Sequence, residues 1–326
     1  MPKVSVLVPV YNVAPYIERC ARSLFEQTLD DIEILFINDC TPDNSMDIIR
    51  RVLTEYPERT AQTRIYDMPQ NSGQATVRAF GMNKATGDYV IHCDADDWVD
   101  TDLYDKMYQC AVRTKADIVV CDEIYEEHSG DIVHVVEELP ATCRELLVSW
   151  YKRTVGLFVH NKMVCRSLYL DNDIYPWAGL NMWEDNGLLA RMLYFGGTLS
   201  QIRGSYYHYN RTNINATTCG YGEKAVNQMI GIAQHLTDFF ESIPDAEDFR
   251  KTKMAFQFLA RINLITDKFK NIKRYNNTFV GSETIASELD ERAFSRKGRF
   301  RFRMVKWHLT YLFVFMFKSY NWLKRK

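Results

Sequence analysis

The segment at residues 4–10, VSVLVPV, is almost continuously apolar. Such a run is expected of a strand covered on both faces, as in the parallel sheets of α/β proteins. Helix-like and strand-like segments then alternate at short intervals as far as about residue 121. This alternation predicts βαβ units and an α/β fold in which a mostly parallel sheet is flanked by helices.

The same periodicities locate the expected elements. Strands are predicted at 4–10, 33–39, 64–66, 89–93, 117–121 and 206–209. Helices are predicted at 15–28, 46–56, 72–85 and 139–153 and within 180–194. Gly87 is expected to end the third helix in a left-handed conformation. Beyond about Gly222 the pattern is helical to the end of the chain, which predicts a domain over 1–215 and a helical C-terminal region over 216–326.

Composition excludes several classes of protein. Apolar residues make up 46% of the chain and charged residues 25%, which is ordinary for a folded globular protein. Eight cysteines are scattered with no C-x-x-C pair, so neither a disulfide framework nor a zinc site is expected, and the thiols are expected to be reduced in the cytoplasm. The first residues read as a strand rather than a signal peptide.

Three polar clusters follow predicted strands. They are Tyr11-Asn12, Asn38-Asp39 and the acidic group Asp94-Ala95-Asp96-Asp97. Ligands of parallel α/β sheets bind outside the carboxyl ends of the strands. Because all three clusters fall at such ends, we expect them to share one ligand site.

The acidic group has two interpretations. Carboxylates two residues apart at a strand end can face one ligand, and Mg²⁺ and Mn²⁺ prefer oxygen donors, often one or two carboxylates with substrate phosphates. Alternatively, Asp96 or Asp97 caps the segment that follows. The position after a buried strand favours the metal site.

Further polar positions also allow a functional and a local interpretation. Asp39 can accept hydrogen bonds from a base or ribose, or can serve an Asx-type turn. Gly73 and Arg78 lie at a helix start suited to phosphate, although a simple N-cap with a surface arginine would look the same. Glu184 and Asp185 are candidates for a general base, or are acids placed favourably at a helix N-terminus.

Read together, these clusters resemble the family 2 glycosyltransferases, the inverting group with the GT-A (Rossmann-like) fold that includes enzymes of bacterial cell-surface polysaccharides. Order and spacing agree across about residues 3–100, and weaker similarities follow at Asn161-Lys162, Glu184-Asp185 and Tyr207-His208-Tyr209. The segments that carry the resemblance are 4–12, 37–39, 43–45, 71–73, Arg78, 85–89 and 94–97. The resemblance implies a nucleotide-sugar half at 1–100 and an acceptor half at 101–215.

The resemblance also implies roles for matching positions. Arg78 would lie near the donor diphosphate, Asp94 near the ribose and metal, and Asp96 would be the direct ligand of Mn²⁺ or Mg²⁺. Asp185 would be the catalytic base, with Glu184 beside it. The remaining donor-site positions are Pro9, Tyr11, Asn12, Asp39, Gly73 and Ala95, of which Pro9, Tyr11 and Asp39 would line the nucleobase pocket.

The implied activity is metal-dependent transfer of a sugar, with inversion, from a nucleotide-diphosphate sugar such as a UDP-sugar to a hydroxyl of a glycan or lipid-linked acceptor. The sequence contains no G-x-G-x-x-G after the first strand, no P-loop, no H-E-x-x-H and no G-x-S-x-G. The alternatives are a nucleotidyltransferase that makes a sugar nucleotide and a non-catalytic glycan- or lipid-binding module. No nucleic-acid partner is expected.

The end of the chain is strongly basic. Residues 296–326 carry ten Lys or Arg and no Asp or Glu, so the rest of the chain, with 30 basic and 42 acidic residues, has a net charge of −12. The fourteen residues 304–317 would span roughly 21 Å as a helix, short of the ~30 Å core of a bilayer. Basic flanks and interfacial aromatics predict peripheral binding to an anionic membrane, on its cytoplasmic face. The alternative is a helix packed on the acidic body.

Overall fold

The computed structural model describes residues 2–134, 138–153, 155–213, 222–265, 269–290, 299, 302–303 and 305–307. Most of the basic tail at 296–326 therefore lies outside the described residues, as do most positions around the domain boundary expected near residue 215. Within the described residues the chain divides into two compact units. The first comprises 1–146 and 157–220, and the second comprises 147–156 and 221–326.

The first unit begins with the predicted parallel sheet. Strands β1 (Val4–Val10), β2 (Ile32–Asn38), β3 (Thr63–Asp67) and β4 (Tyr89–His92) lie in the order β3-β2-β1-β4, and every neighbouring pair is parallel. Helices α1 (Ile17–Phe25), α2 (Ser45–Leu53) and α3 (Gln74–Lys84) connect them. These elements confirm the predicted alternation of residues 4–93.

Beyond β4 the sheet becomes mixed. The short strand β8 (Lys162–Cys165) lies antiparallel between β4 and β6 (Ile118–Glu127). Next come β9 (Leu199–Asn210), parallel to β6, and β5 (Trp98–Val99), antiparallel to β9. The hairpin strand β7 (Gly130–His134) pairs with β6. Antiparallel partners this short carry little periodicity, and the sequence analysis predicted neither β5, β7 nor β8.

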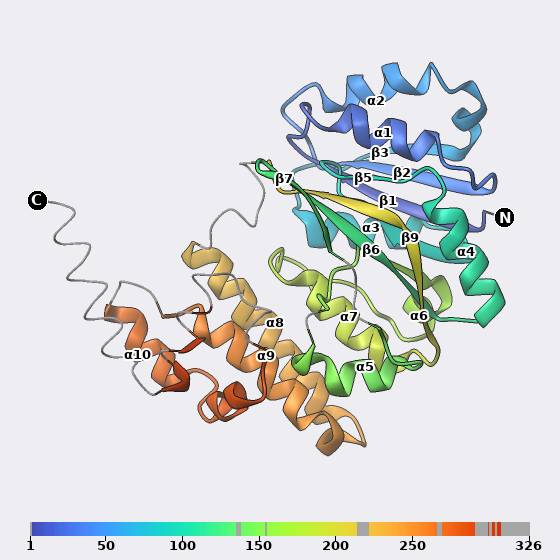
Figure 1. Cartoon of the computed structure of the whole chain (residues 1–326). Helices are drawn as coiled ribbons and strands as arrows, with labels where there is room; N and C mark the ends of the chain where they lie inside the picture. The colour runs from blue at the N-terminus through green and yellow to red at the C-terminus, as the bar shows by residue number, and fades with distance from the viewer. Residues whose placement is uncertain are drawn as a thin grey trace, which may run out of the picture. The chain divides into compact units, whose positions relative to one another are not determined.

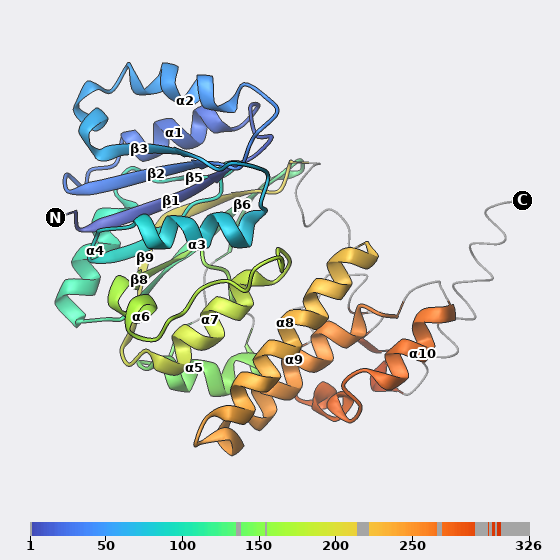
Figure 2. The same cartoon turned by 180° about the vertical axis from the view of Figure 1, so that it is seen from behind.

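Helices cover both faces of this sheet (Figures 1 and 2). Every second residue of β1 faces the side covered by α1, α2 and α4 (Leu103–Thr114). These residues, Val4, Val6, Val8 and Val10, form the main apolar core with the three helices. On the other face α3 lies so close to the strands that a Cβ at Gly81 would be 2.6 Å from Ile37 and 3.3 Å from Leu7. Figure 2 shows α3 in front of the strands, followed by α6 (Arg166–Asp171) and α7 (Glu184–Phe195).

The predicted left-handed stop at Gly87 is wrong. Helix α3 ends through Ala85 in an extended conformation (φ −61°, ψ 135°), and Gly87 has no positive φ. Glycine is required there for space, since a Cβ would be 2.8 Å from Ser5 N and 2.9 Å from the carbonyl carbon of Val4. The Gly87 N–H donates to Ser5 Oγ at 2.8 Å, which fixes the entry into β4.

The second unit is helical. It contains α8 (Glu223–Ser242), α9 (Arg250–Ile262) and α10 (Phe269–Asn277), together with the segment 147–156. That segment includes the end of α5 (Cys143–Ser149) and a 3-10 helix, Trp150–Lys152. Trp150 stacks on Phe256 of α9 at 4.5 Å between ring centroids, and Thr252 Oγ1 donates to Leu147 O at 2.9 Å. In the described ranges, no helix has the length and apolarity needed to cross a bilayer.

Candidate active site at the carboxyl ends of the strands

The acidic loop after β4 is held by a buried arginine. Asp94 Oδ1 accepts a hydrogen bond from Arg78 Nη2 at 2.7 Å and one from Gln74 Nε2 at 3.4 Å. Arg78 lies on α3 and is only 2% exposed, with its guanidinium directed toward the loop that follows β4. Of the two interpretations of Arg78, the surface arginine is therefore excluded, and the buried guanidinium bonds directly to the predicted acidic cluster.

Arg78 also faces a second acid. Its Nε lies 3.5 Å from Glu184 Oε1 at the start of α7. Burial acts to lower the pKa of Arg78, but the carboxylates of Asp94, Glu184 and Asp185 outweigh it and raise that pKa. The guanidinium thus stays charged and links α3, the acidic loop and α7 through electrostatic attraction.

Asp97 anchors the acidic loop to β9. It is 1% exposed, and it accepts hydrogen bonds from Tyr207 Oη at 2.6 Å and from the Asn210 N–H at 2.7 Å. Tyr207 Oη in turn accepts the N–H of Asp94 at 3.0 Å. Both oxygens of Asp97 are engaged in this way, so its carboxylate holds the loop in place.

Asp96 is half-buried and differs from Asp97 in its surroundings. Asn213 Nδ2 donates to Asp96 Oδ2 at 2.8 Å, and Asn210 Nδ2 donates to the Asp96 carbonyl at 3.1 Å. Burial raises the pKa of Asp96, and the nearby negative charge of Asp94 raises it further. A carboxylate in this position is stabilised in its charged form by a bound cation.

The acidic loop fits a hard divalent cation that is held mostly by its substrate. Among the described residues, no group of three or more His, Cys, Asp and Glu side chains has the arrangement of a complete protein metal site. Mg²⁺ and Mn²⁺ are nevertheless commonly bound by one or two carboxylates, with phosphate oxygens and water as the other ligands. Asp96 and Asp94 are the two carboxylates of this loop that could contribute such oxygen ligands.

Asp39 connects the second strand to the start of α3. Its Oδ1 accepts the Ser72 N–H at 2.6 Å and its Oδ2 accepts the Gly73 N–H at 2.9 Å. Gly73 has φ +80° and a Cβ there would be 2.3 Å from Asn181 Nδ2, so only glycine fits. Asp39 is 4% exposed. Contact with a nucleobase remains a prediction, and any such bond would use the lone pairs that Ser72 and Gly73 leave.

The local turn that was one of the two interpretations of Asp39 is made by Asp43. Asp43 Oδ1 accepts hydrogen bonds from Thr41 Oγ1 at 2.7 Å and from Ser45 Oγ at 2.6 Å. The Asn12 N–H donates to Thr41 Oγ1 at 2.7 Å, which joins this turn to the end of β1. The Thr41 N–H in turn donates to Asn38 Oδ1 at 2.8 Å, so hydrogen bonds through this turn connect the first two strand-end clusters.

The other predicted donor residues differ in exposure. Tyr11 is 47% exposed and Asn12 is also exposed, with a left-handed φ of 55°, while Pro9 is half-buried. Together they form an accessible rim at the end of β1. Ala95 is only 3% exposed and its side chain packs in the apolar core, so only its main chain can contact a ligand.

Glu184 and Asp185 begin α7 after Trp183, which has a left-handed φ of 70°. Burial, followed by the charge of Asp185, raises the pKa of Glu184 to about 8, and Glu184 faces Arg78. Burial also raises the pKa of Asp185. Asp185 is only half-buried, and its Oδ1 accepts the Asn186 N–H at 2.9 Å. Of the two acids, Asp185 is therefore the one with access to a substrate.

The structure adds His160 and Glu123, which the sequence analysis did not single out, and it buries Lys162, which the sequence analysis named only as a weak similarity. His160 Nε2 shares a short hydrogen bond with Glu123 Oε1, and both side chains are buried. Lys162 is 1% exposed; its Nζ donates to Phe158 O at 2.9 Å and Asn161 Oδ1 at 2.7 Å, and burial lowers its pKa to about 8. The acidic pair Asp122-Glu123, which directly follows the apolar residues 118–121 of β6, is the signal that could have indicated this cluster.

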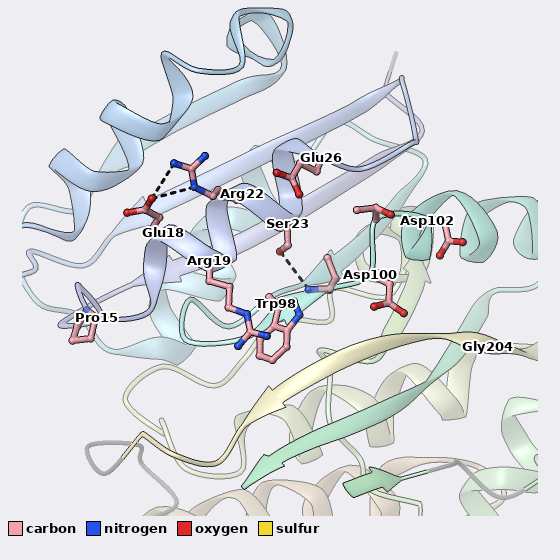
Figure 3. A pocket seen from close by; sticks show the side chains of 12 residues that line it. Pro15, Glu18, Arg19, Arg22, Ser23, Glu26, Trp98, Asp100, Asp102 and Gly204 are labelled. Carbon is pink, nitrogen blue, oxygen red and sulfur yellow. Dashed lines mark hydrogen bonds and ion pairs between the residues drawn. The ribbon is translucent and has the colours of Figure 1, made fainter. Parts of the chain in front are cut away.

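A pocket of about 840 Å³ lies elsewhere, between α1 and β5 (Figure 3). Its charged side chains interact mainly with one another and with neighbouring helices. Arg22 pairs with Glu18 and Glu55, Asp102 pairs with Lys106, and Asp100 Oδ1 lies 2.8 Å from His208 Nε2. Because these groups are already paired, the pocket lacks the uncompensated charge found at Asp96.

Comparisons with known proteins agree with this geometry. The family model described as Glycosyl transferase family 2 matches residues 5–171, just over half of the chain. EpsH of Bacillus subtilis (strain 168) is 29% identical over 258 residues, which cover 77% of this chain and 72% of EpsH. EpsJ of the same organism is 38% identical over 141 residues, but these cover only 43% of this chain and 39% of EpsJ. Both relatives are named as glycosyltransferases.

Solved structures show the same fold. Staphylococcus aureus TarS 1–349 superposes with a TM-score of 0.68 at 17% identity, over 98% of this chain and 91% of that one. TarS 1–349 has also been solved in complex with UDP-GlcNAc, with a TM-score of 0.67 at 17% identity over the same shares of the two chains. The mannosyltransferase PcManGT from Pyrobaculum calidifontis, in complex with GDP-Man and Mn²⁺, gives a TM-score of 0.54 at 14% identity over 98% of this chain and 88% of that one. Likeness at this identity concerns the fold, and it confirms the predicted α/β class.

Proposed function

Because the chain belongs to glycosyl transferase family 2, we propose that it transfers a sugar from a nucleotide-diphosphate sugar, with UDP-sugars as the first candidates, to a hydroxyl of a glycan or lipid-linked acceptor, with inversion. The observation that carries this proposal is the link from Asp94 through Arg78 to Glu184. It brings the acidic loop, a buried cation and the two acids of α7 to one end of the sheet.

The donor is assigned to the half of the unit formed by residues 1–100. Pro9, Tyr11 and Asp39 would receive the base at the rim beside β1, and Asn12, Gly73 and the main chain of Ala95 complete the expected donor contacts. Arg78, which keeps its positive charge despite burial, would lie near the diphosphate. The acceptor is assigned to residues 101–215. The bound UDP-GlcNAc and GDP-Man of the structural relatives support a nucleotide-sugar donor.

Asp96, with Asp94 beside it, would hold Mn²⁺ or Mg²⁺. A divalent ion supplies charge that stabilises the departing nucleoside diphosphate. The raised pKa of Asp96 supports this assignment, since a carboxylate crowded by a second one is relieved by a cation.

Asp185 is assigned as the catalytic base, with Glu184 in a supporting role against Arg78. In a single displacement the acceptor oxygen bonds to the anomeric carbon while the bond to the diphosphate oxygen breaks. That oxygen keeps the electron pair, and Asp185 takes the hydroxyl proton. Attack from the face opposite the leaving group inverts the anomeric carbon. The half-buried position of Asp185 suits it to accept this proton.

The test measures release of nucleoside diphosphate from UDP-, GDP- and TDP-sugars. Each donor is assayed in the presence and absence of Mn²⁺, and each of these conditions is repeated with and without acceptor glycans. We expect metal-dependent release, absent in Asp96→Ala. Asp185→Asn should bind donor as the wild type does, but should transfer roughly 10²–10⁴-fold more slowly. Asp47→Asn, at an exposed position of α2, is the matched control. Near-wild-type transfer by Asp96→Ala would remove the metal assignment.

The same assay distinguishes the two alternatives. A nucleotidyltransferase would instead release pyrophosphate from a nucleoside triphosphate and a sugar phosphate. A non-catalytic module would bind a glycan or lipid and release nothing. The two carboxylates, the buried arginine and the half-buried Asp185 favour the transferase over both.

The basic tail is assigned to an anionic membrane, on its cytoplasmic face, where a lipid-linked acceptor for surface polysaccharide synthesis would be accessible. The described part of the tail supports this assignment. Phe302 and Val305 are buried, while Arg299, Arg303 and Lys306 are exposed, and Trp307 is 62% exposed. Exposed cations beside an exposed tryptophan are typical of a segment that lies at a lipid interface.

A further inference from the structure

Four aromatic rings are stacked on the acceptor side of the first unit. The ring of His160 lies 5.3 Å from Phe158 with an interplanar angle of 11°, and 5.5 Å from Tyr209 with an angle of 7°. It also stacks on Tyr207 at 4.5 Å and 24°. Stacking at these separations is favourable, and it gives the rings a common orientation.

The inner end of this stack is part of the proposed active site. Tyr207 donates its hydroxyl hydrogen to Asp97 and accepts the N–H of Asp94. His160 is positioned by its hydrogen bond to the buried Glu123.

The outer end of the stack is Phe158. Its ring is 39% exposed although one side is stacked on His160. The carbonyl of Phe158 accepts a hydrogen bond from the fully buried Lys162, so the main chain under the ring is fixed. An exposed aromatic ring on a rigid support loses little conformational entropy when a ligand packs against it.

We infer that the exposed ring of Phe158 is the stacking platform for a pyranose ring of the acceptor. The inference rests on the proposed function. The apolar C–H face of a pyranose carries partial positive charge and complements the negative face of an aromatic ring. A nucleobase is the less suitable occupant, because the expected base site is the rim at Pro9 and Tyr11, at the end of β1. The stack leads from Phe158 through His160 to the loop of Asp94 and Asp97.

The experiment uses the full chain and saturation-transfer NMR with three methyl β-glycopyranosides, of glucose, galactose and N-acetylglucosamine, in the presence of UDP and Mg²⁺. We expect saturation of protons on one face of at least one glycoside. Phe158→Ala should weaken that binding about tenfold, and Phe158→Trp should restore it. Phe195→Ala is the matched control, because Phe195 of α7 is 42% exposed. Donor turnover without acceptor is measured on all variants.

The outcomes separate this inference from the proposed function. If no glycoside is saturated by the wild type, or if Phe158→Ala gives the wild-type pattern, the platform is overturned. If Phe158→Ala lowers donor turnover without acceptor as strongly as it lowers glycoside binding, the ring is a general structural support and the inference fails. Phe158-dependent glycoside binding without any donor turnover supports the platform and contradicts the proposed transferase.

Discussion

At the scale of single residues, the one positive charge of Arg78 faces the negative charges of three carboxylates. Asp94, Glu184 and Asp185 all act on the charge of Arg78, although only Asp94 forms a hydrogen bond with it. One cation can neutralise about one carboxylate, and the other two are left partly uncompensated in a buried setting. Burial, followed by the charge of Asp185, accordingly raises the pKa of Glu184 to about 8.

Glu184→Gln should therefore change how stability depends on pH. Because the pKa of Glu184 rises from the ordinary 4.5 to about 8 on folding, its contribution to stability is complete below pH 4.5 and is lost as pH rises through 8. The glutamine variant lacks this loss. We expect the melting temperature of the variant to rise relative to that of the wild type as the pH increases from 5 to 9. Each kcal/mol of difference in unfolding free energy corresponds to about 2–4 °C. Calorimetry at several pH values measures this difference, with the exposed Glu58→Gln as control. Parallel curves of melting temperature against pH for Glu184→Gln and the wild type would contradict the prediction.

His92 is a second residue with an electrostatic consequence. It ends β4, is fully buried, and neither ring nitrogen has a hydrogen-bond partner among the described residues. Burial lowers its pKa, and Arg78 lowers it further. Folding therefore requires the neutral ring. Stability is present above the ordinary pKa of 6.5 and is lost as pH falls below it, because the unfolded chain takes up the proton.

His92→Leu removes this titration. We expect the wild type to lose stability between pH 7 and pH 5 through this residue, and the variant to lose less over the same interval. Urea unfolding at the two pH values measures the difference, and His128→Leu, at an exposed position, serves as control. An equal acid sensitivity of His92→Leu and wild type would show that His92 titrates normally.

At the scale of elements, β9 positions the acidic loop although more than a hundred residues separate the two. The Tyr207 hydroxyl joins Asp97 to the main chain of Asp94, and Asn210 completes the attachment. The apolar run of β4 predicts where the loop begins. Only the pairing of β9 into the sheet determines where its carboxylates point.

Tyr207→Phe should loosen the loop while keeping the ring stack. Loss of the hydroxyl leaves Asp97 Oδ2 and the Asp94 N–H without their partner, which we expect to lower the free energy of unfolding by about 1–3 kcal/mol. Donor affinity should fall as well, since Asp94 and Asp96 lie on the loop. Tyr206→Phe, on the neighbouring position of β9, is the control. Wild-type stability and donor affinity in Tyr207→Phe would contradict this role.

At the scale of the whole molecule, charge is distributed unevenly along the chain. The body carries a net −12, whereas residues 296–326 carry ten cations. Phe302 packs edge-on against Phe258 at 6.2 Å, so the start of the tail is part of the second unit. Deleting the tail would disturb that packing, and a charge variant is the cleaner test.

Replacing Arg299, Arg303 and Lys306 together by Gln should weaken binding to anionic vesicles. Each cation near such a surface contributes about 1 kcal/mol, so the triple variant should bind roughly 100-fold less well. Flotation with phosphatidylserine–phosphatidylcholine vesicles measures binding, and added salt should weaken that of the wild type. Neutralising Arg64, Arg113 and Lys115, exposed on the first unit, is the control. Equal flotation of both triple variants would rule out the tail as the membrane-binding segment.

The sequence by itself determined the parallel half of the sheet and the order of the polar clusters at its strand ends. Both follow from local patterns, because the apolar run at Val4–Val10 and the turn after Asp39 can each be read within a few residues. The family is predicted by the same segments. The mixed half was predicted only in part: the strands expected at 117–121 and 206–209 fall within β6 and β9, but β8 and β5 are only four and two residues long and were not predicted.

Only the tertiary structure decided which side chains meet. Arg78 and Glu184 face each other across 106 positions of sequence, and Asp97 and Tyr207 across 110. The burial of Arg78, the absence of a hydrogen-bond partner for His92 within the described part of the chain, and the stack under Phe158 likewise depend on how α3, β4, β8 and β9 pack. Local propensity carries no information about such pairs, because their energy comes from contacts that form only when distant segments are folded together.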